Sequence, residues 1–371
     1  MMEFIIYTNT IWDSPPRARH QLAHALSQNH KVTFIASNEM GMPGLQTIKV
    51  NSRLEVIIPS FPLSKRFRYR TPLLNEGYQA WLFPILKRKF KDRDNLIVIC
   101  TDFGGYLINK FLSPVIYFAS DDYINNVKVP AAVKAYTAYT QRKLIEKSMM
   151  ALATAQTLVS DFKKYNKRSY ELPLGAPEFK MTHPNENILR KRDGKIKVVL
   201  LGFIDKIKTP VALLNKILAI DQIHLYLIGP IKGDILELLH HGNKVHSLGI
   251  QTGQALSETL QDMDVSIAPY YMEDTNTGRT PNKMWQYLAA GKPAVITNLP
   301  NVRHWEFPEG TVYKANTDDE FVEMIVNAYD ADSQELIGDR MKLAKENSWG
   351  KRAELLVKLI RENHIGNEAG K

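Results

Sequence analysis

Residues 268–296 combine the residue types that could bind a diphosphate; they read APYYMEDTNTGRTPNKMWQYLAAGKPAVI. The pattern predicts the end of an apolar strand, a polar loop, and a helix that begins near Pro281. The N–H groups of Asn282, Lys283 and Met284 would then face the loop without helical partners, and a helix N-terminus beside a lysine favours an anion. The segment therefore predicts a diphosphate site in which Lys283 binds phosphate oxygens. The alternative is an ordinary capped helix with a solvated lysine.

Other strands of the same half also end in residues that would bring backbone close to a ligand. Glycine follows three apolar strands, and a backbone without a Cβ can approach a phosphate, a sugar or a base. These residues are Gly202, Lys206 and Lys208 after the first strand, Gly229 and Pro230 after the second, and Gly249 and Ile250 after the third. The lysines could reach the diphosphate. For each glycine the alternative is a sharp turn, and for each lysine a solvated side chain.

Acidic residues at strand ends are candidates for a catalytic base. Asp121 and Asp122 directly follow the apolar strand Val115–Ala119, so they lie at its carboxyl edge, where a parallel sheet binds ligands. Adjacent residues of an extended chain point in opposite directions. One carboxylate can therefore face a substrate while the other caps Val127 or the following turn. Asp102, at the end of another strand, is a third candidate. The alternative is that both Asp121 and Asp122 are caps.

Residues 64–93 interleave basic and aromatic side chains. This composition suits the interface of an anionic bilayer, and it also suits single-stranded nucleic acid. The predicted membrane patch contains Lys65, Arg66, Arg68, Arg70, Trp81, Lys87, Arg88 and Lys89. The alternative is a solvated basic helix.

The positive charge of the chain is concentrated in its first half. The 371 residues have a net charge of +9, and the first 172 residues carry 24 Lys and Arg against 13 Asp and Glu. This asymmetry indicates an anionic partner for the first half: nucleic acid, an anionic membrane surface or an acidic glycan. The alternative is a basic face that only keeps the protein in solution.

The composition predicts a cytoplasmic globular protein. Hydrophobic residues make up 44% and charged residues 23%, and the length suits two domains. The single cysteine, Cys100, lies in an apolar run and predicts a core residue in a reducing compartment. No apolar run is long enough for a signal peptide or a membrane span.

Alternating strand and helix patterns predict an α/β fold with two doubly wound parallel sheets. In the first half we expect strands Glu3–Asn9, Lys31–Ala36, Leu54–Pro59, Asn95–Thr101 and Val115–Ala119, and helices Arg17–Gln28, Tyr106–Phe111 and Ala131–Met149. In the second half we expect strands Lys197–Leu201, His224–Ile228, Val245–Leu248, Val265–Pro269 and Pro293–Thr297, and helices Pro210–Ile220, Asp234–His240, Gly253–Met263 and Pro281–Ala290. The Pro- and Gly-rich stretch Leu172–Lys195 reads as a linker. Two Rossmann-like domains, residues 1–172 and 178–345, follow, with an amphipathic last helix near Gly350–Asn363.

The segment 268–296 resembles the donor-binding signature of GT-B glycosyltransferases, P-x-K-x-x-E-Y-L-A-A-G-K-P-V. From Pro281 this chain reads PNKMWQYLAAGKPAV. In that family the helix glutamate hydrogen-bonds the donor ribose, and Gln286, which replaces it here, can still do so. Retaining enzymes carry a second glutamate eight positions earlier, where this chain has Gly278. The absence of both carboxylates puts the retaining mechanism in doubt.

Two segments of the first half resemble bacterial polysaccharide transferases. WDSPPRARHQL, residues 12–22, is similar to the loop after the first strand in transferases of the teichuronic-acid type. YFASDDY, residues 117–123, resembles a strand end in the same enzymes and in the inverting glucuronosyltransferase of xanthan assembly, whose base is an aspartate after Ala-Ser. That enzyme also has the equivalents of Lys283 and Gln286, and its preceding strand ends in Ala-Pro-Tyr, like the strand before Tyr270 here.

The resemblance implies a hexosyl- or glucuronosyltransferase that moves a sugar from a nucleotide sugar, UDP-linked, to a lipid-linked or growing cell-surface glycan. It implies inversion, with Asp121 preferred over Asp122 as the base. Lys283 would neutralise the leaving diphosphate, so no metal and no cofactor is expected. Tyr270, Asn282 and Gln286 complete the expected donor contacts. The acceptor-side loop contains Pro16, Arg17 and Arg19.

The same resemblance implies peripheral attachment to the inner face of the cell membrane, because polyprenyl-linked acceptors lie there. It also implies that the helix in residues 350–371 packs back on the first domain. Two alternatives are a retaining GT-B transferase and a noncatalytic nucleotide-binding partner of another transferase. Nucleic acid is not an expected partner, since the sequence contains no recognisable motif for it.

Overall fold

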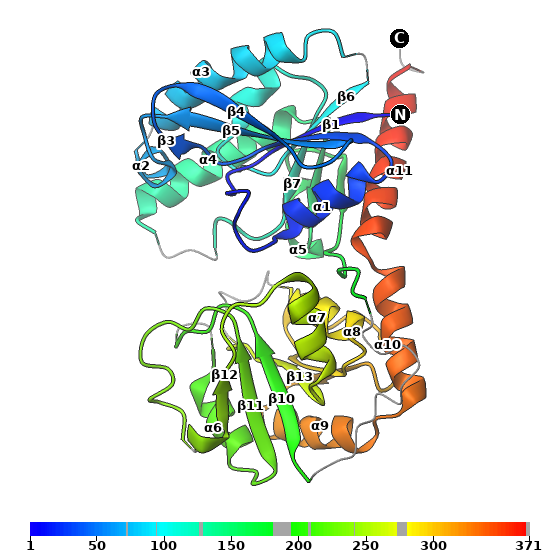
Figure 1. Cartoon of the computed structure of the whole chain (residues 1–371). Helices are drawn as coiled ribbons and strands as arrows, with labels where there is room; N and C mark the ends of the chain where they lie inside the picture. Colours follow the sequence, from blue (N-terminus) through cyan, green and yellow to red (C-terminus); the bar gives the residue numbers. More distant parts are fainter. Residues whose placement is uncertain are drawn as a thin grey trace. The chain divides into compact units, whose positions relative to one another are not determined.

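The computed structural model describes residues 1–71, 73–93, 95–125, 129–180, 194–206, 209–240, 242–272 and 280–368. The chain forms two units, each built around one sheet (Figure 1). The first unit consists of Met1–Leu174 together with Arg352–Lys371, and the second of Gly175–Lys351. The sequence of the second unit is thus inserted into that of the first.

The first unit contains a nine-stranded sheet in the order β3-β5-β2-β1-β6-β7-β8-β9, with β4 paired to β5. The strands are β1 (Glu3–Tyr7), β2 (Lys31–Ile35), β3 (Glu39–Met40), β4 (Gly44–Lys49), β5 (Leu54–Phe61), β6 (Leu96–Cys100), β7 (Val115–Ala119), β8 (Met150–Ala153) and β9 (Ser169–Glu171). The β4–β5 pair is antiparallel and the other pairs are parallel. Every residue of β6 and β7 is buried, and the two strands are continuous apolar runs, as is usual where helices cover both faces of a parallel sheet.

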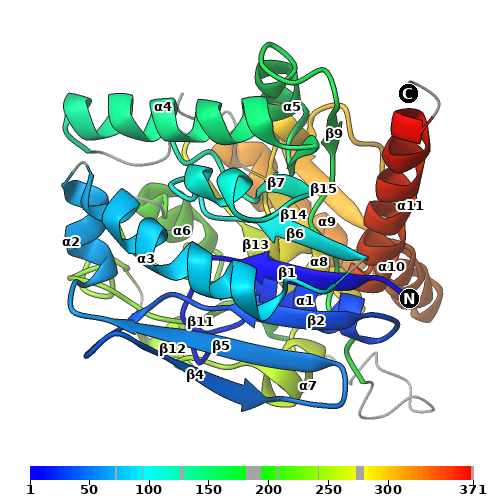
Figure 2. The same cartoon turned by 90° about the horizontal axis from the view of Figure 1, so that it is seen from above.

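Helices cover this sheet and connect its strands. They are α1 (Ala18–Ser27), α2 (Lys65–Arg70), α3 (Leu74–Lys89), the 3₁₀ helix η1 (Tyr106–Lys110), α4 (Ala131–Lys147), α5 (Gln156–Phe162) and α11 (Trp349–Glu368). Helix α11 contacts the unit far from its own place in the sequence (Figure 2): the Tyr170 hydroxyl donates to Asn363 Oδ1 at 3.1 Å, and Arg352 Nε donates to the Leu174 carbonyl at 3.3 Å.

The second unit contains a six-stranded parallel sheet in the order β12-β11-β10-β13-β14-β15. Its strands are β10 (Ile196–Leu201), β11 (Ile223–Ile228), β12 (Val245–Ser247), β13 (Val265–Ala268), β14 (Ala294–Thr297) and β15 (Val312–Ala315). Its helices are α6 (Val211–Leu218), η2 (Gly242–Lys244), α7 (Gly253–Gln261), α8 (Lys283–Ala289), η4 (Pro300–Val302), α9 (Asp318–Asp330) and α10 (Gln334–Glu346). The predicted α/β class and its parallel sheets are confirmed.

Buried polar groups hold helix α8 in place through a residue within it and a residue just after it. The Tyr287 hydroxyl donates to the Ile267 carbonyl and accepts from the Leu201 N–H, both at 2.9 Å, which ties α8 to β13 and β10. Arg340 is fully buried; its Nη1 donates to the Gly291 carbonyl at 3.1 Å and pairs with Asp332 at 2.6 Å. Breaking a buried pair of this kind leaves a charge without a partner and is strongly destabilising. The position of α8 on the sheet is therefore well determined.

One predicted helix is wrong. Residues 234–240 form successive turns instead, in which the Glu237 N–H donates to the Asp234 carbonyl and the Leu239 N–H to the Leu236 carbonyl. Only Ile235 and Leu239 of this segment bury apolar side chains, and so short a segment gains little from helical hydrogen bonds.

Within the described residues, no helix combines the length and the apolar character needed to cross a membrane.

Candidate functional site

The carboxyl edge of the second sheet carries three glycines at the ends of neighbouring strands. Gly202 follows β10 and Gly229 follows β11, with φ of +128° and +127°, and Gly249 follows β12 with φ of +69°. A Cβ on residue 229 would lie 2.1 Å from the Gly202 carbonyl oxygen, so no other residue fits there. The Gly229 N–H donates to the Gly249 carbonyl at 2.7 Å. Bare backbone therefore lines this edge across three strands.

Lys283 brings a positive charge to this edge. A Cβ on Gly202 would lie 2.7 Å from Lys283 Nζ, so the ammonium group of α8 rests against the end of β10. The same Nζ lies 5.8 Å from the centre of the Tyr270 ring, within cation–π range. Tyr270 is in turn held by Thr297, whose Oγ1 accepts from the Tyr270 N–H at 2.9 Å. The structure thus brings together Gly202, Tyr270 and Lys283, while the anchoring role of Thr297 was not predicted.

Two of the three N–H groups expected to be free before α8 make backbone hydrogen bonds. The helix begins at Lys283, and a turn precedes it in which the Asn282 N–H donates to the Thr280 carbonyl at 2.8 Å and the Met284 N–H to the Pro281 carbonyl at 3.1 Å. Proline therefore ends the loop rather than opening the helix. At this edge Lys283, rather than the helix terminus, is therefore the feature that suits an anion.

The other predicted donor residues are spread along the same edge. Lys206 is exposed and its Nζ pairs with Asp234 at 3.3 Å, so an acid already partly neutralises it. Pro230, Ile250 and Asn282 are exposed, whereas Gln286 is partly buried. The positions Lys208 and Gly278 lie outside the described residues.

The three candidate acids of the first unit differ in environment. Asp122 is buried; its Oδ1 accepts from the Ile124 and Asn125 N–H groups at 3.1 and 3.0 Å, and its Oδ2 from the Asn125 side chain. Asp102 is also buried and accepts from the Tyr69 hydroxyl and the Gly104 N–H. Asp121 is exposed. Asp122 caps the turn that follows it, although the Val127 part of this expectation lies outside the described residues.

The predicted acceptor-side loop is held by neutral histidine and tryptophan side chains. His20 Nδ1 accepts from the Arg17 N–H at 3.0 Å and its Nε2 lies 3.3 Å from the Ile11 carbonyl, while its ring stacks on Phe34. The Trp12 ring packs against the same His20 and Phe34 rings. Pro16 and Arg17 are exposed on this loop, but Arg19 is buried.

Only some residues of the predicted membrane patch lie on the protein surface. Arg68 is wrong as a member: it is 3% exposed, donates to Asn38 Oδ1 at 2.6 Å, and lies 3.8 Å from the centre of the Tyr78 ring. Lys65 is only partly exposed, and Trp81 packs against Phe61. The exposed members are Arg66, Arg70, Lys87, Arg88 and Lys89. Two apolar side chains near these positions are exposed: Phe67, at 53%, directly follows Arg66, and Leu73, at 74%, lies three residues after Arg70.

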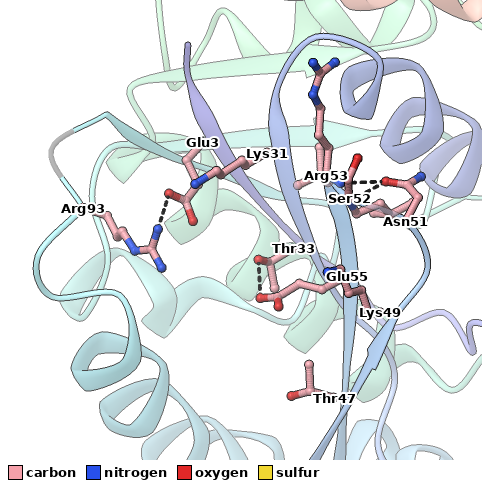
Figure 3. A pocket seen from close by; sticks show the side chains of 12 residues that line it. Glu3, Lys31, Thr33, Thr47, Lys49, Asn51, Ser52, Arg53, Glu55 and Arg93 are labelled. Carbon is pink, nitrogen blue, oxygen red and sulfur yellow. Dashed lines mark hydrogen bonds and ion pairs between the residues drawn. The ribbon is translucent and has the colours of Figure 1, made fainter.

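A polar pocket of about 450 Å³ opens at the other edge of the first sheet, where β1, β2 and β5 begin (Figure 3). Arg93 pairs with Glu3 at 3.0 Å, and the Thr33 hydroxyl donates to Glu55 at 2.9 Å. Its acids are thus engaged with neighbouring groups, and the pocket contains none of the predicted site residues.

Comparisons with known proteins show similarity for the second unit and for the fold. Residues 191–331 match the family model described as "Glycosyl transferases group 1". Over 136 residues the chain is 32% identical to TuaH of Bacillus subtilis (strain 168), named as a teichuronic acid biosynthesis glycosyltransferase. That match covers 34% of this chain and 32% of the relative, so the chain spans about a third of the length of that relative. Residues 191–331 are therefore similar to the group 1 glycosyl transferases, and the predicted resemblance to a teichuronic-acid-type transferase is confirmed.

The solved structures establish the fold of both units. Sucrose-phosphate synthase from Thermosynechococcus elongatus aligns with a TM-score of 0.74 at 11% identity, over 99% of this chain and 100% of that one. Anabaena HepE in complex with UDP and glucose aligns with a TM-score of 0.67 at 12% identity, over 97% and 100%. The fold is that of the GT-B glycosyltransferases, as predicted.

The predicted acceptor-side loop should lose stability in acid. Burial, followed by the nearby Arg19 and Arg17, lowers the pKa of His20 to about 4, from 6.5, while the Ile11 carbonyl opposes this shift. The folded state therefore disfavours the proton that the unfolded chain takes up. We expect the unfolding free energy of the first unit to fall as the pH decreases from about 6.5 to about 4, by up to roughly 3 kcal/mol, since one pKa unit corresponds to about 1.4 kcal/mol.

Denaturant titrations at several pH values measure this dependence. His20→Gln should be less stable at neutral pH but should lose much of the pH dependence. The control His240→Gln changes an exposed histidine and should keep the pH dependence of the wild type. An unchanged dependence in His20→Gln would show that other groups cause the loss.

Proposed function

We propose that this protein is a glycosyltransferase that moves a sugar from a UDP-sugar to a lipid-linked or growing cell-surface glycan, with inversion at the anomeric carbon. One observation carries the proposal: the Lys283 ammonium group lies against the bare backbone of Gly202, in the unit whose sequence matches the group 1 glycosyltransferases. A cation beside accessible backbone suits a diphosphate followed by a sugar. The HepE structures, which hold UDP and UDP-glucose, support a uridine nucleotide.

Lys283 would act on the leaving group. As the bond between the anomeric carbon and the diphosphate oxygen breaks, negative charge grows on that oxygen, and a positioned cation stabilises it without a metal ion. Tyr270 limits the freedom of the lysine, since the ammonium group lies near its ring. The Gln286 amide would hydrogen-bond the ribose of the donor.

Asp121 would act as the general base. Its carboxylate would take the proton of the acceptor hydroxyl while the hydroxyl oxygen forms the new bond to the anomeric carbon. Of the three strand-end acids, Asp121 is the exposed one, and its Oδ1 accepts from the Asp122 N–H at 3.0 Å. Asp122 and Asp102 are buried, and each accepts hydrogen bonds from two or more neighbouring groups. Gln286 and Gly278 replace the two glutamates of retaining relatives, which supports inversion over retention.

The acceptor would be reached at an anionic membrane surface. Arg66 and Arg70 of α2 are exposed, and Phe67 between them is 53% exposed. Two cations flanking an exposed ring suit the headgroup region of an anionic leaflet. The side chains of Arg68 and Tyr78 take no part, because they are buried.

Lys283→Ala should weaken UDP binding by about 1.5–3 kcal/mol, the scale of a hydrogen bond to a charged group. Isothermal titration of the full chain with UDP measures the change. Lys345→Ala removes an exposed cation from α10 and should leave the affinity unchanged. Equal affinities in the wild type and Lys283→Ala would place the diphosphate elsewhere.

Asp121→Asn should lower kcat by at least about a hundredfold, because removing a general base costs about 10²–10⁴ in rate. UDP affinity should stay within about threefold, since the acid belongs to the other unit. Asp122→Asn is the matched control: it should lose less activity and more stability, because Asp122 caps a turn. Steady-state kinetics and thermal unfolding of the three proteins separate these effects.

The anomeric configuration of the product provides the independent test of mechanism, read by NMR after turnover with a screened series of nucleotide sugars. A product that keeps the configuration of the donor would refute inversion and favour the retaining alternative. Binding of UDP without turnover on any donor and acceptor pair would favour a noncatalytic nucleotide-binding partner.

Replacing Arg66, Phe67 and Arg70 together by serine should reduce sedimentation with anionic vesicles, since each basic residue near such a surface contributes about 1 kcal/mol. The matched control replaces Lys163, Tyr165 and Lys167, which are also two cations and one ring exposed on the first unit. Binding that survives the first triple substitution, or falls equally in both, would show that α2 is not the membrane contact.

A further inference from the structure

The amino ends of β1, β2 and β5 carry polar side chains on a face that is apolar farther along the same strands. Glu3, Thr33 and Glu55 are the polar residues. Side chains two residues apart in a strand share a face, so this face also carries the isoleucine that follows each of them two positions later. All three isoleucines are fully buried in the core of the first unit: Ile5, Ile35 and Ile57. The face therefore changes from polar to apolar within two residues.

The connection between β2 and β5 leaves this end of the face without a helix of its own. Residues 36–53 form the short strands β3 and β4, whereas the connection between two parallel strands is usually a helix that covers the sheet. Strand β4 instead widens the sheet, with Lys49 opposite Glu55 and Glu55 opposite Thr33. The pocket of about 450 Å³ lies over this polar end of the face (Figure 3).

Two polar pairs hold the carboxylates of the pocket in place. The Glu3 side chain is only 16% exposed and pairs with Arg93 at 3.0 Å. The Thr33 hydroxyl, in a residue that is 3% exposed, donates to Glu55 Oε1 at 2.9 Å. Figure 3 shows both pairs with their partners facing each other. The carboxylates are therefore positioned by the protein rather than freely solvated.

Positive charge exceeds negative charge among the lining residues. The four cations are Lys31, Lys49, Arg53 and Arg93, and the two acids are Glu3 and Glu55. Within the part of the chain that the structure describes, Lys31 and Lys49 form no ion pair. Two strand spacings of about 4.8 Å separate β2 from β4, so both lysines can reach one ligand from different sides. The lining thus suits a ligand with one or two negative charges.

The other lining residues limit the kind of anion. The lining contains no aromatic side chain on which a nucleobase could stack. It does contain the hydroxyl groups of Thr47 and Ser52 and the amide of Asn51, which can bond to hydroxyl groups. A carboxylate such as Glu55 repels a simple anion but accepts a hydrogen bond from a sugar hydroxyl. The volume lies within the range of about 300–1,000 Å³ that small-molecule sites occupy.

We propose that this pocket binds an anionic sugar, a small carbohydrate that carries one carboxylate or phosphate group. Lys31 and Lys49 bind the acid group, and Glu55 accepts from the sugar hydroxyls. The pocket lies where the strands begin, whereas Asp121 follows the end of β7. A strand of five residues spans about 16 Å, so a ligand here does not occupy the place of the acceptor. The site is therefore additional to the proposed transfer reaction.

Isothermal titration of the full chain at low salt tests the pocket, with saturating UDP present to occupy the proposed donor site. Glucuronate and glucose 6-phosphate are the probes. Lys31→Gln/Lys49→Gln should bind the tighter of the two at least about fivefold more weakly than the wild type, the scale of two partly exposed ion pairs. The matched control Lys163→Gln/Lys167→Gln removes the same charge from exposed positions elsewhere on the first unit and should stay within about twofold.

The two probes distinguish the source of the negative charge, since tighter binding of one identifies a uronate or a sugar phosphate as the ligand. Two simpler molecules test each half of the assignment. Glucose binding as tightly as the anionic sugars would overturn the role of the charge, and inorganic phosphate binding as tightly as glucose 6-phosphate would overturn the sugar. No binding of either anionic sugar by the wild type, or an equal loss in the control, would overturn the site itself.

Glu55→Gln provides a readout that lost charge alone would not give. The substitution keeps the shape of the side chain but replaces the carboxylate by a weaker acceptor. The preference for glucose 6-phosphate over inorganic phosphate should fall at least about threefold, while phosphate itself should bind no more weakly, because a negative charge has been removed. An unchanged preference would contradict hydroxyl recognition by Glu55.

These titrations require no turnover, so their outcome is separate from that of the transferase assays. An inactive protein that still binds an anionic sugar through Lys31 and Lys49 would keep this site and lose the proposed reaction. An active protein that binds none would keep the reaction and lose this site.

Discussion

In the second unit, the ends of β10 and β11 come so close that no side chain fits between them. A Cβ at residue 229 would lie 2.1 Å from the Gly202 carbonyl oxygen. This contact keeps the sheet edge free of side chains over two strands and leaves beside Gly202 a space that the end of Lys283 occupies. The Tyr287 hydroxyl supports this arrangement by joining β10 and β13 to α8. The location of the cation thus depends on backbone packing and on one buried phenol.

Much of this fold follows from patterns that the sequence displays directly. Strands such as β7 and β10 are buried apolar runs of the length that parallel strands need, and their bounds differ little from those expected. The pattern does not identify β4, because Gly44–Lys49 is polar, largely exposed and paired at an edge. It also misplaces the start of α8, since the turn at Asn282 depends on a single hydrogen bond to Thr280. Such local features depend on tertiary contacts, which the hydrophobic periodicity of a sequence does not reveal.

In the site, too, some features could be predicted from the sequence and others could not. Residue types at strand ends were enough to select Gly202, Tyr270 and Lys283, because parallel strands direct all their following loops to one edge. The environment of each charge could not be read in the same way. Arg68 lies in a run of basic residues, yet Asn38 and the Tyr78 ring hold it in the interior. A run of charges specifies composition, whereas the partners that bury one member, here Asn38 in the segment after β2 and Tyr78 in the next helix, are set by the tertiary fold.

The insertion of the second unit has a consequence for how the protein is made. The chain leaves the first unit after Leu174 and returns at Arg352. The two crossings are joined within the second unit, where the Ala176 N–H donates to the Asn347 carbonyl and the Trp349 N–H to the Ala176 carbonyl, at 2.9 and 3.1 Å. During synthesis, residues 175–351 are therefore complete before the first unit receives its last helix. Domains usually fold in the order in which they emerge from the ribosome; here the unit that begins first is the one that finishes last.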